Sequence, residues 1–433
     1  MRILPRISIS TGCRVGALIL LASLPAGCQS PSAPVAHDST HDIVGRIGEN
    51  RYYTPANQIL TPAGLQVELP GMRPQALALS PDGRLLVTAG KTHDLVVVEP
   101  RSGKVLQRVL LPSEKDQDPA LQPVSDHILQ PDKDGQISFT GLAFSPAGSR
   151  IYLANVDGSI KVFGIEKDGR VVGLFTMPLP PANAPRRVAE VPAGLAVSQD
   201  GKRLYVTLNL SNRLAELDTA TGKVLRLWDV GVAPYDVVLA GHKAYVSNWG
   251  GTRPGTDSVT GPAGRGTLVR VDPVRYIASE GSVSVIELAT SRQAAETAAA
   301  LTEILTGLHS SAMVGSPNGR WVVAANAGSD TLSVIDTRSD RVTETLCARQ
   351  TTSDLFGAQP NALAFDKSGN RLFVCNGTQN AVAVFDFAPG QSKLLGLIPV
   401  GWFPGAVVHD PRRKALYVAN LKGVASTMTL RPN

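Results

Sequence analysis

Seven copies of one short sequence pattern constrain the fold of this chain more than any other feature. Each copy has a short apolar run, a turn such as Ser-Pro-Asp-Gly, and then an alternating run such as Leu-Tyr-Val. The copies begin at residues 77, 142, 195, 237, 313, 363 and 407. Their closest spacing is 42 residues, so the minimal unit is near forty residues and longer spacings indicate loop insertions. Periods of this size indicate a solenoid or a propeller.

The number of strands in each unit favours the propeller. A third alternating strand follows the first pair, as at residues 95–99 and 331–336, and a Gly-Lys turn leads to a fourth at 103–111. Four antiparallel strands make one propeller blade. A closed ring also removes exposed strand edges, whereas a solenoid needs end caps. We therefore predict an all-β fold, a seven-bladed β-propeller of four-stranded antiparallel blades, with eight blades as the alternative.

The two ends of the repeat region predict how the ring closes. The seventh copy shows only two clear strands before the sequence ends at Asn433. Residues 58–69, ahead of the first copy, have a strand-turn-strand pattern without a partner. We expect these residues to complete the seventh blade, so that N- and C-terminal strands share the last blade.

The first 27 residues have the pattern of an export signal. Three arginines precede an apolar run at 15–22, and small residues lead to Cys28. The run is too short to cross a bilayer as a helix. The sequence Ala26-Gly27-Cys28 resembles the bacterial lipoprotein cleavage box, which implies a lipid on Cys28. Pro25 stands where that box usually has an aliphatic residue, and ordinary cleavage nearby is the alternative.

The signal sets the predicted domain boundaries and location. Residues 1–27 are a lipoprotein-type signal peptide, residues 28–50 a polar, Pro- and Ser-rich tether, and residues 51–433 the propeller. The expected location is the periplasm or cell envelope, with membrane contact only through the lipid anchor.

Charge and composition argue against nucleic acid as a partner. The formal net charge is +6, and removal of Arg2, Arg6 and Arg14 with the signal leaves an excess of three. Only 5% of the residues are aromatic. Phosphate binding needs a concentrated basic face, which this balance does not supply.

Cysteine and histidine spacing gives no reason to expect a bound metal or other cofactor. Beyond the signal only Cys347 and Cys375 remain, and the sequence leaves open whether they pair or stay as separate thiols. There is no Cys-x-x-Cys and no zinc-type Cys/His spacing.

Three long insertions are the places where a functional site is expected. They are an acidic segment at 112–136, a Pro-rich segment at 178–192 and a Gly- and Arg-rich segment at 249–281. All fall in loops between blades or between second and third strands, which share one face of a propeller. Long loops on a rigid scaffold commonly carry binding residues.

The third insertion supplies most of the candidate binding residues. Arginine forks bind carboxylate or phosphate, and a Gly-rich backbone approaches anions closely. The sequence therefore predicts binding of a small anionic ligand or a protein domain. The alternative is a solvated loop whose arginines pair with the acidic insertion. The candidate residues are Trp249, Arg253, Arg265, Arg270, Arg275 and Trp402.

The repeat resembles a known family. The sequences Tyr152–Asn155, Tyr245–Asn248 and Tyr417–Asn420 are similar to the signature of YVTN-repeat, lactonase-like bacterial β-propellers. The resemblance covers about residues 58–420. Residues 51–64 and 260–267 further resemble propellers that precede an alkaline-phosphatase-like phosphoesterase domain. The sequence carries no phosphoesterase metal set, so the resemblance implies the propeller half of such a system without that domain.

Two functions of different classes follow. The first is a binding or scaffold module that acts through its insertion-rich face. The alternative is a lactonase-like hydrolase, in which a divalent metal at the channel mouth polarises a carbonyl and activates water. No catalytic motif is present, and the inner-strand starts offer mainly Pro, Leu, Ala and Val, so the sequence favours the binding module.

Overall fold

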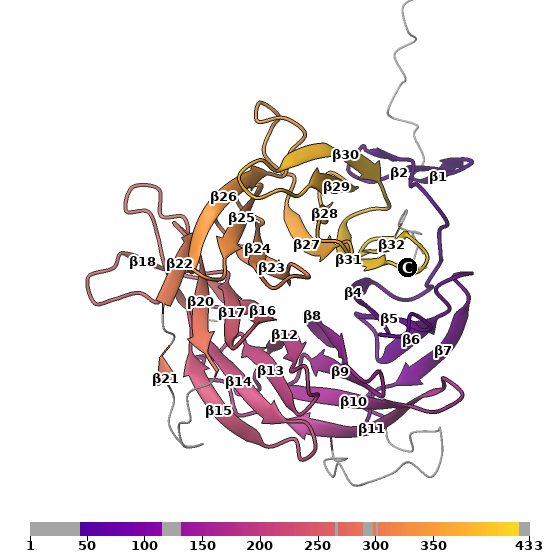
Figure 1. The fold of residues 1–433 in the computed structure, drawn as a ribbon, viewed down its shortest axis with the longest axis horizontal. Coiled ribbons are helices and arrows are strands. Elements are labelled where there is room, and N and C mark those ends of the chain that lie inside the picture. The colour runs from indigo at the N-terminus through magenta and orange to yellow at the C-terminus, as the bar shows by residue number, and fades with distance from the viewer. Residues whose placement is uncertain (1–43, 115–130, 265–266, 289–297, 300–301, 424–433) are drawn as a thin grey trace, which may run out of the picture. The chain divides into compact units, whose positions relative to one another are not determined.

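The computed structural model describes residues 44–114, 131–264, 267–288, 298–299 and 302–423. The chain divides into two units, Met1–Asp42 and Ile43–Asn433. The predicted signal peptide, Cys28 and most of the predicted tether lie outside the described residues. In the second unit the strands form sheets arranged around a common centre (Figure 1). None of the described residues forms a helix long and apolar enough to cross a membrane.

Each of the first six repeat copies contributes four antiparallel strands to one sheet, as predicted. Blades one to three contain β4 (Pro74–Leu79), β5 (Leu86–Gly90), β6 (Asp94–Val98), β7 (Val105–Leu110), β8 (Ile137–Phe144), β9 (Arg150–Asn155), β10 (Ser159–Ile165), β11 (Val171–Pro178), β12 (Pro192–Val197), β13 (Arg203–Leu208), β14 (Arg213–Asp218) and β15 (Val224–Asp229). A short strand, β21 (Ala298–Ala299), pairs in parallel with β15.

The remaining blades continue the ring. They contain β16 (Pro234–Ala240), β17 (Lys243–Asn248), β20 (Gly281–Glu287), β22 (Thr302–Thr306), β23 (Ser310–Gly315), β24 (Trp321–Asn326), β25 (Thr331–Asp336), β26 (Arg341–Cys347), β27 (Pro360–Phe365), β28 (Arg371–Asn376), β29 (Ala381–Asp386), β30 (Lys393–Pro399), β31 (Pro404–Asp410) and β32 (Ala415–Asn420). Between β17 and β20 the chain forms a separate two-stranded sheet, β18 (Thr260–Pro262) and β19 (Leu268–Arg270).

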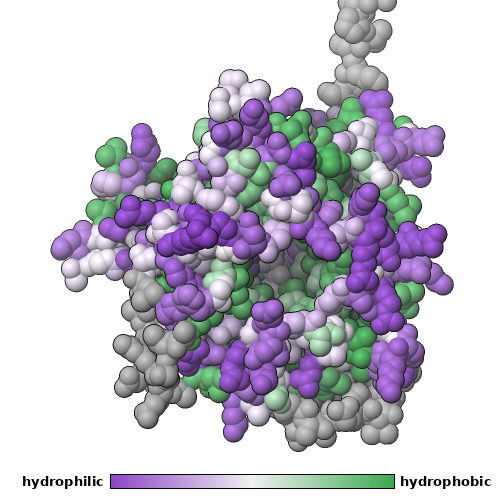
Figure 2. Space-filling view, in the orientation of Figure 1, coloured by the Kyte–Doolittle hydropathy of each residue, from purple (hydrophilic) through white to green (hydrophobic). Residues whose placement is uncertain are grey.

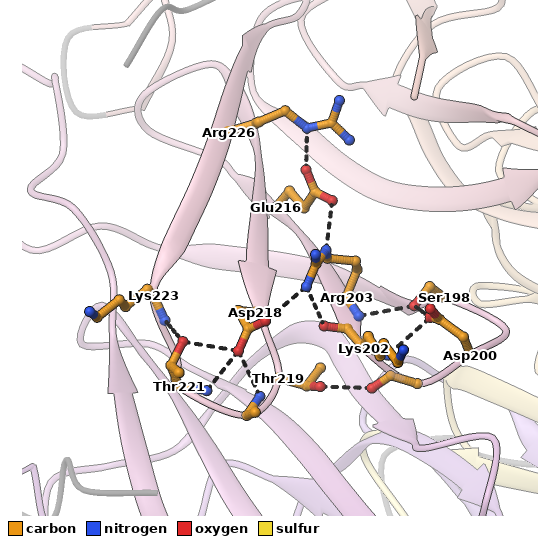
Figure 3. A network of polar contacts seen from close by, with 12 residues as sticks. Ser198, Asp200, Lys202, Arg203, Glu216, Asp218, Thr219, Thr221, Lys223 and Arg226 are labelled. Atoms are coloured by element: carbon orange, nitrogen blue, oxygen red, sulfur yellow. Dashed lines mark hydrogen bonds and ion pairs between the residues drawn. The ribbon is translucent and has the colours of Figure 1, made fainter. Parts of the chain in front are cut away.

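A Ser-x-Asp or Ser-x-Asn turn explains why the first two strands of blades one, three and five form a hairpin. In blade three the Ser198 hydroxyl donates to Asp200 Oδ1 at 2.6 Å and accepts from the Arg203 amide at 2.9 Å. Asp200 Oδ1 also accepts the Lys202 amide at 3.0 Å (Figure 3). These local bonds satisfy the turn backbone without help from other blades. The same arrangement recurs at Ser80 with Asp82 and at Ser316 with Asn318.

A second polar network holds the outer strands of the same blade together. The buried Glu216 carboxylate on β14 lies between Arg203 on β13, at 3.4 Å, and Arg226 on β15 (Figure 3). Tyr205 donates to Glu216 Oε1 at 3.3 Å. Because the carboxylate has partners on both neighbouring strands, it is compensated within the sheet.

The hydrophobic core is divided among the interfaces between neighbouring blades. A cluster between blades one and two contains Val87, Leu95, Leu153 and Phe163, and similar clusters follow at each of the next five interfaces. The seventh lies between blades one and seven, where half-buried Tyr417 packs against a cluster with Met72, Leu86 and Val96. The blades therefore close into a ring of seven.

Ring closure differs from the predicted sharing of the last blade. In the described residues the seventh sheet has only the strands β31 and β32. Its connecting turn contacts blade one: Arg413 donates to the Gly83 carbonyl at 2.8 Å, and Arg412 to the Pro81 carbonyl at 3.3 Å. Arg412 also donates to the Asp82 carbonyl. Side-chain packing and these arginines, rather than a completed sheet, join the first and last blades.

The segment at 58–69 is placed elsewhere. It begins in a three-stranded sheet of β1 (Gly45–Gly48), β2 (Arg51–Tyr53) and β3 (Ile59–Leu60). The Gln58 side chain donates to the Thr378 carbonyl of blade six and accepts from the side-chain amide of Asn380. The Ala63 backbone amide donates to the Pro399 carbonyl at 2.9 Å. The prediction that 58–69 completes blade seven is therefore wrong, because these residues do not pair with β31 or β32. The start of the segment bonds to blade six, and Leu69 packs in the cluster between blades one and seven.

The two cysteines of the propeller are free thiols. Cys347 ends β26 in blade five, and Cys375 lies on β28 in blade six. Burial raises the pKa of the Cys375 thiol, which keeps it protonated and unreactive.

Candidate functional site

One face of the ring carries all three insertions. The segments at 112–136 and 178–192 connect the fourth strand of one blade to the first strand of the next, and 249–281 connects β17 to β20. Sheets in this strand order place both kinds of connection on the same side of the ring. The predicted grouping of the insertions on one face is thus confirmed for the strands that flank them. Figure 2 shows a hollow at the centre of the ring.

An aromatic cluster lies where blade four meets this face. Trp249 stacks on Tyr235 with ring centroids 4.9 Å apart, and the edge of Phe139 meets both rings at 5.3 and 5.7 Å. His309, which precedes β23, lies 6.1 Å from Trp249. Phe139 comes from blade two, on a bulge of β8 with a left-handed φ of 49°. We call these four side chains the aromatic cluster. Trp249 remains 37% exposed and Tyr235 is buried.

Directly after Tyr235, the innermost strand of blade four carries an acidic residue at a position where the other blades have a small one. In each blade, the residue just before the repeat copy lies on the innermost strand. It stands either inside the β-bulge of that strand or directly after the bulge. In blade four this residue is Asp236, which pairs with Ser247. In the other six blades it is Ala76, Gly141, Gly194, Ala312, Ala362 or Ala406.

The Asp236 carboxyl is held by backbone groups of two blades. Its Oδ1 accepts the Val237 amide at 2.8 Å, and its Oδ2 accepts the Met313 amide of blade five at 2.8 Å. A Cβ on Gly194 of blade three would lie 2.4 Å from Oδ1, so the glycine leaves room for the carboxyl. Burial raises the pKa of Asp236 to about 7, although both backbone bonds lower it.

The three predicted arginines in the described residues have separate local partners. Arg253 donates to the Val230 carbonyl at 2.6 Å and lies 3.1 Å from Asp229. Arg270 is 3.8 Å from Glu280. These carboxylates belong to blade three or to the same insertion rather than to the acidic segment.

Arg275 and Trp402 are the other two predicted binding residues that the structure describes. Arg275 is 73% exposed and lies 3.9 Å from Asp272. Trp402 lies between blades six and seven, with the Lys422 ammonium 4.8 Å from its ring centroid. Arg265 lies outside the described residues.

The Gly- and Arg-rich insertion displays apolar side chains to solvent. Val274 is 83% exposed and Tyr276 71% exposed. Val259, Leu268 and Ile277 are also exposed. The insertion projects from the ring beside blade four, at the left of Figure 1, and hydrophobic atoms are visible among hydrophilic ones there in Figure 2. Five exposed large apolar residues in one segment are typical of an interaction site.

A fourth loop on the same face was missed by the sequence analysis. The connection from β26 to β27 exposes Leu355 and Phe356, and the Arg349 guanidinium lies 4.4 Å from the Phe356 ring centroid. The 50-residue spacing between the copies at 313 and 363 already exceeded the minimal unit, so a signal was present.

The acidic insertion is fixed to blade two by a buried cation. Lys161 on β10 is fully buried, and its Nζ lies 2.5 Å from Glu114 and 2.8 Å from Asp132. It also donates to the Pro112 carbonyl at 2.8 Å. Both ends of the insertion thus bind one ammonium group.

Metal ligands do not gather in the part of the chain that the structure describes. No group of three or more His, Cys, Asp or Glu side chains there is arranged to hold a metal ion. Asp236 pairs with Ser247, and its carboxyl oxygens accept backbone amides rather than sharing a site with a second carboxylate or imidazole.

Comparison with known proteins supports the propeller fold. Residues 269–398 match the family model described as lactonase, 7-bladed beta-propeller, which covers less than a third of the chain. Hydrazine synthase of Kuenenia stuttgartiensis is 18% identical with a TM-score of 0.57, covering 83% of this chain and 95% of that one. U3-55K is 13% identical with a TM-score of 0.59, covering 84% and 92%. The WD40 repeats of RRP9 are 13% identical with a TM-score of 0.58, covering 84% and 91%.

No curated protein matches the sequence. The structural similarities are too distant in sequence to show more than the fold. The family match supports a lactonase-like propeller and leaves the activity of this chain to be argued from its own residues.

Proposed function

We propose that this chain is an exported, lipid-anchored β-propeller that binds a partner protein domain through its insertion-rich face. The exposed apolar surface of the insertion at 249–281 carries this proposal. A protein domain is preferred to a small anionic ligand because Arg253, Arg270 and Arg275 each have a carboxylate partner already. The sequence resemblance to phosphoesterase-linked propellers makes a phosphoesterase domain the first candidate partner.

The hydrolase alternative has weaker support from the residues. The match to the lactonase model favours it. However, no group of three or more His, Cys, Asp or Glu side chains among the described residues is arranged to hold a divalent metal. A binding role needs only an accessible surface on a rigid scaffold, and the propeller supplies both.

Crosslinking in living cells tests the proposed surface. A photoreactive phenylalanine analogue at Val274 is expected to give one discrete adduct, which mass spectrometry then identifies. The matched control is Lys167, an exposed residue in the turn between β10 and β11 on the opposite face. Tyr276→Asp in the same chain should abolish the adduct, because a charge in an apolar contact is desolvated without a partner.

Three results would count against this function. They are no adduct at Val274, equal adducts at Val274 and Lys167, and an adduct that Tyr276→Asp leaves unchanged. An adduct with a protein other than a phosphoesterase keeps the docking surface and removes the phosphoesterase assignment.

The lipid anchor has a separate test. Cys28→Ala is expected to abolish incorporation of radiolabelled palmitate and to move the protein from the membrane fraction to the soluble periplasmic fraction. Cys347→Ala serves as the control and should leave both measurements unchanged. Retention of the label in Cys28→Ala would show that the lipid is attached elsewhere or that the label does not report lipidation of this chain.

A further inference from the structure

The position of Asp236 breaks the sevenfold repeat at the centre of the molecule. Six blades have alanine or glycine at this position and only blade four has a charged residue. The neighbouring blade has glycine at the equivalent residue, Gly194, where a Cβ would contact Oδ1 at 2.4 Å. A carboxyl accommodated in this way by its neighbour needs a reason beyond packing, because alanine or glycine suffices in the other six blades.

The Asp236 carboxyl is oriented but not neutralised. Each oxygen accepts one backbone amide, and a carboxylate oxygen has a further lone pair to offer. Among the residues that the structure describes, no Lys or Arg forms an ion pair with it. The residue is half-buried rather than fully enclosed, so a small cation can approach it. Its raised pKa is the expected cost of burying an acid without a counterion.

The aromatic cluster adds a second attraction for a positive ligand at the same place. Tyr235 precedes Asp236 on the strand, and Tyr235 stacks on the exposed Trp249. Aromatic faces attract ammonium groups, Trp most strongly, and apolar ligand groups pack on the same rings. Phe139 reaches across from blade two, so residues of several blades border the site.

We propose that the mouth of the channel binds a small organic ammonium cation, with the Asp236 carboxylate as its counterion and the aromatic cluster around its apolar part. This ligand class is opposite in charge to the anion that the arginine-rich sequence suggested. This site uses other residues than the proposed protein-binding surface at Val274 and Tyr276. Either proposal can therefore be disproved while the other stands.

Calorimetric titration of the purified full-length chain at pH 8 with benzyltrimethylammonium tests the proposal. We expect saturable binding, and at least tenfold weaker binding of neopentylbenzene, the uncharged isostere. Asp236→Asn should weaken binding of the cation at least tenfold. The matched control, Asp168→Asn in an exposed turn, should leave it unchanged.

Trp249→Leu provides a test that does not depend on the Asp236 variant folding. It should weaken binding of the cation severalfold, with an unchanged circular dichroism spectrum. The proposal is overturned if the native chain shows no saturable binding of the cation, if the uncharged isostere binds equally well, or if a folded Asp236→Asn binds like the native chain.

Discussion

Replacing Lys161 by methionine is expected to lower the free energy of unfolding by about 3 kcal/mol, the lower end of the range for breaking a buried ion pair. The ammonium is fully buried between Glu114 and Asp132 and also bonds the Pro112 carbonyl. Methionine fills the space but leaves the nearly buried Asp132 without a counterion. The lower end applies because Glu114 is 43% exposed and water can solvate it. Urea denaturation at pH 7 measures the difference.

Lys243→Met is the matched control. Lys243 pairs with Asp340 at 2.6 Å, and both side chains keep some contact with water. Its loss is expected to cost about 1 kcal/mol or less. A cost for Lys161→Met as small as that of the control would contradict the structural role assigned to the buried pair.

The pH dependence of the Lys161 effect follows from Asp132. Burial raises the pKa of this carboxyl, but the contact and charge of Lys161 together with the backbone amides of Gly135 and Asp134 outweigh burial, and the pKa lies below its ordinary value. A lowered acid pKa stabilises the fold above the unfolded value and loses that contribution as pH falls through the folded one. The difference between native chain and Lys161→Met should therefore shrink below about pH 4.

Asp236→Asn is expected to have the opposite effect and to stabilise the free protein at pH 8 by about 2 kcal/mol. Burial raises the pKa of Asp236 to about 7, whereas the ordinary value is 3.8. A shift of about three units corresponds to about 4 kcal/mol, from which about 2 kcal/mol is subtracted because an amide nitrogen cannot accept the second backbone bond.

The sign of the Asp236 effect can be checked against pH. The folded state holds the proton more tightly than the unfolded chain, so stability falls as pH rises from about 4 to about 7 and is constant above that window. At pH 4 the acid is protonated in the folded state, and Asp236→Asn should no longer be the more stable chain. Thermal unfolding of both chains between pH 4 and pH 8 makes the comparison. Parallel curves would show that this carboxyl does not titrate in the window.

The sequence predicted the ring well because its signals are local. Alternation of apolar residues defines each strand. In blades one, three and five a Ser-x-Asp or Ser-x-Asn turn closes the hairpin with its own side chains, as at Ser198 and Asp200. Which blade an unpaired segment contacts is not determined by the sequence of that segment alone. Residues 58–69 had strand-like alternation, but contacts at Gln58 and Ala63 join the segment to blade six, a choice set by the folded ring.

The candidate site was predicted less completely. The sequence identified Trp249, which lies in the aromatic cluster. The carboxylate partners of Arg253 and Arg270 could not be predicted, because residue spacing within an insertion does not indicate which side chains meet in the folded protein. Asp236 was overlooked because each repeat copy was taken to begin one residue later. Extending the repeat by one position shows one aspartate against six small residues.

The attachment of the N-terminal sheet determines how the ring bears mechanical load. Tension on the chain ahead of residue 44 would reach the ring through β3, whose neighbours Gln58 and Ala63 bond to Thr378, Asn380 and Pro399. Blade six is a complete four-stranded sheet, whereas blade seven has two strands in the described residues. Tension applied ahead of residue 44 would therefore reach a complete four-stranded sheet before it reaches the seam between the first and last blades.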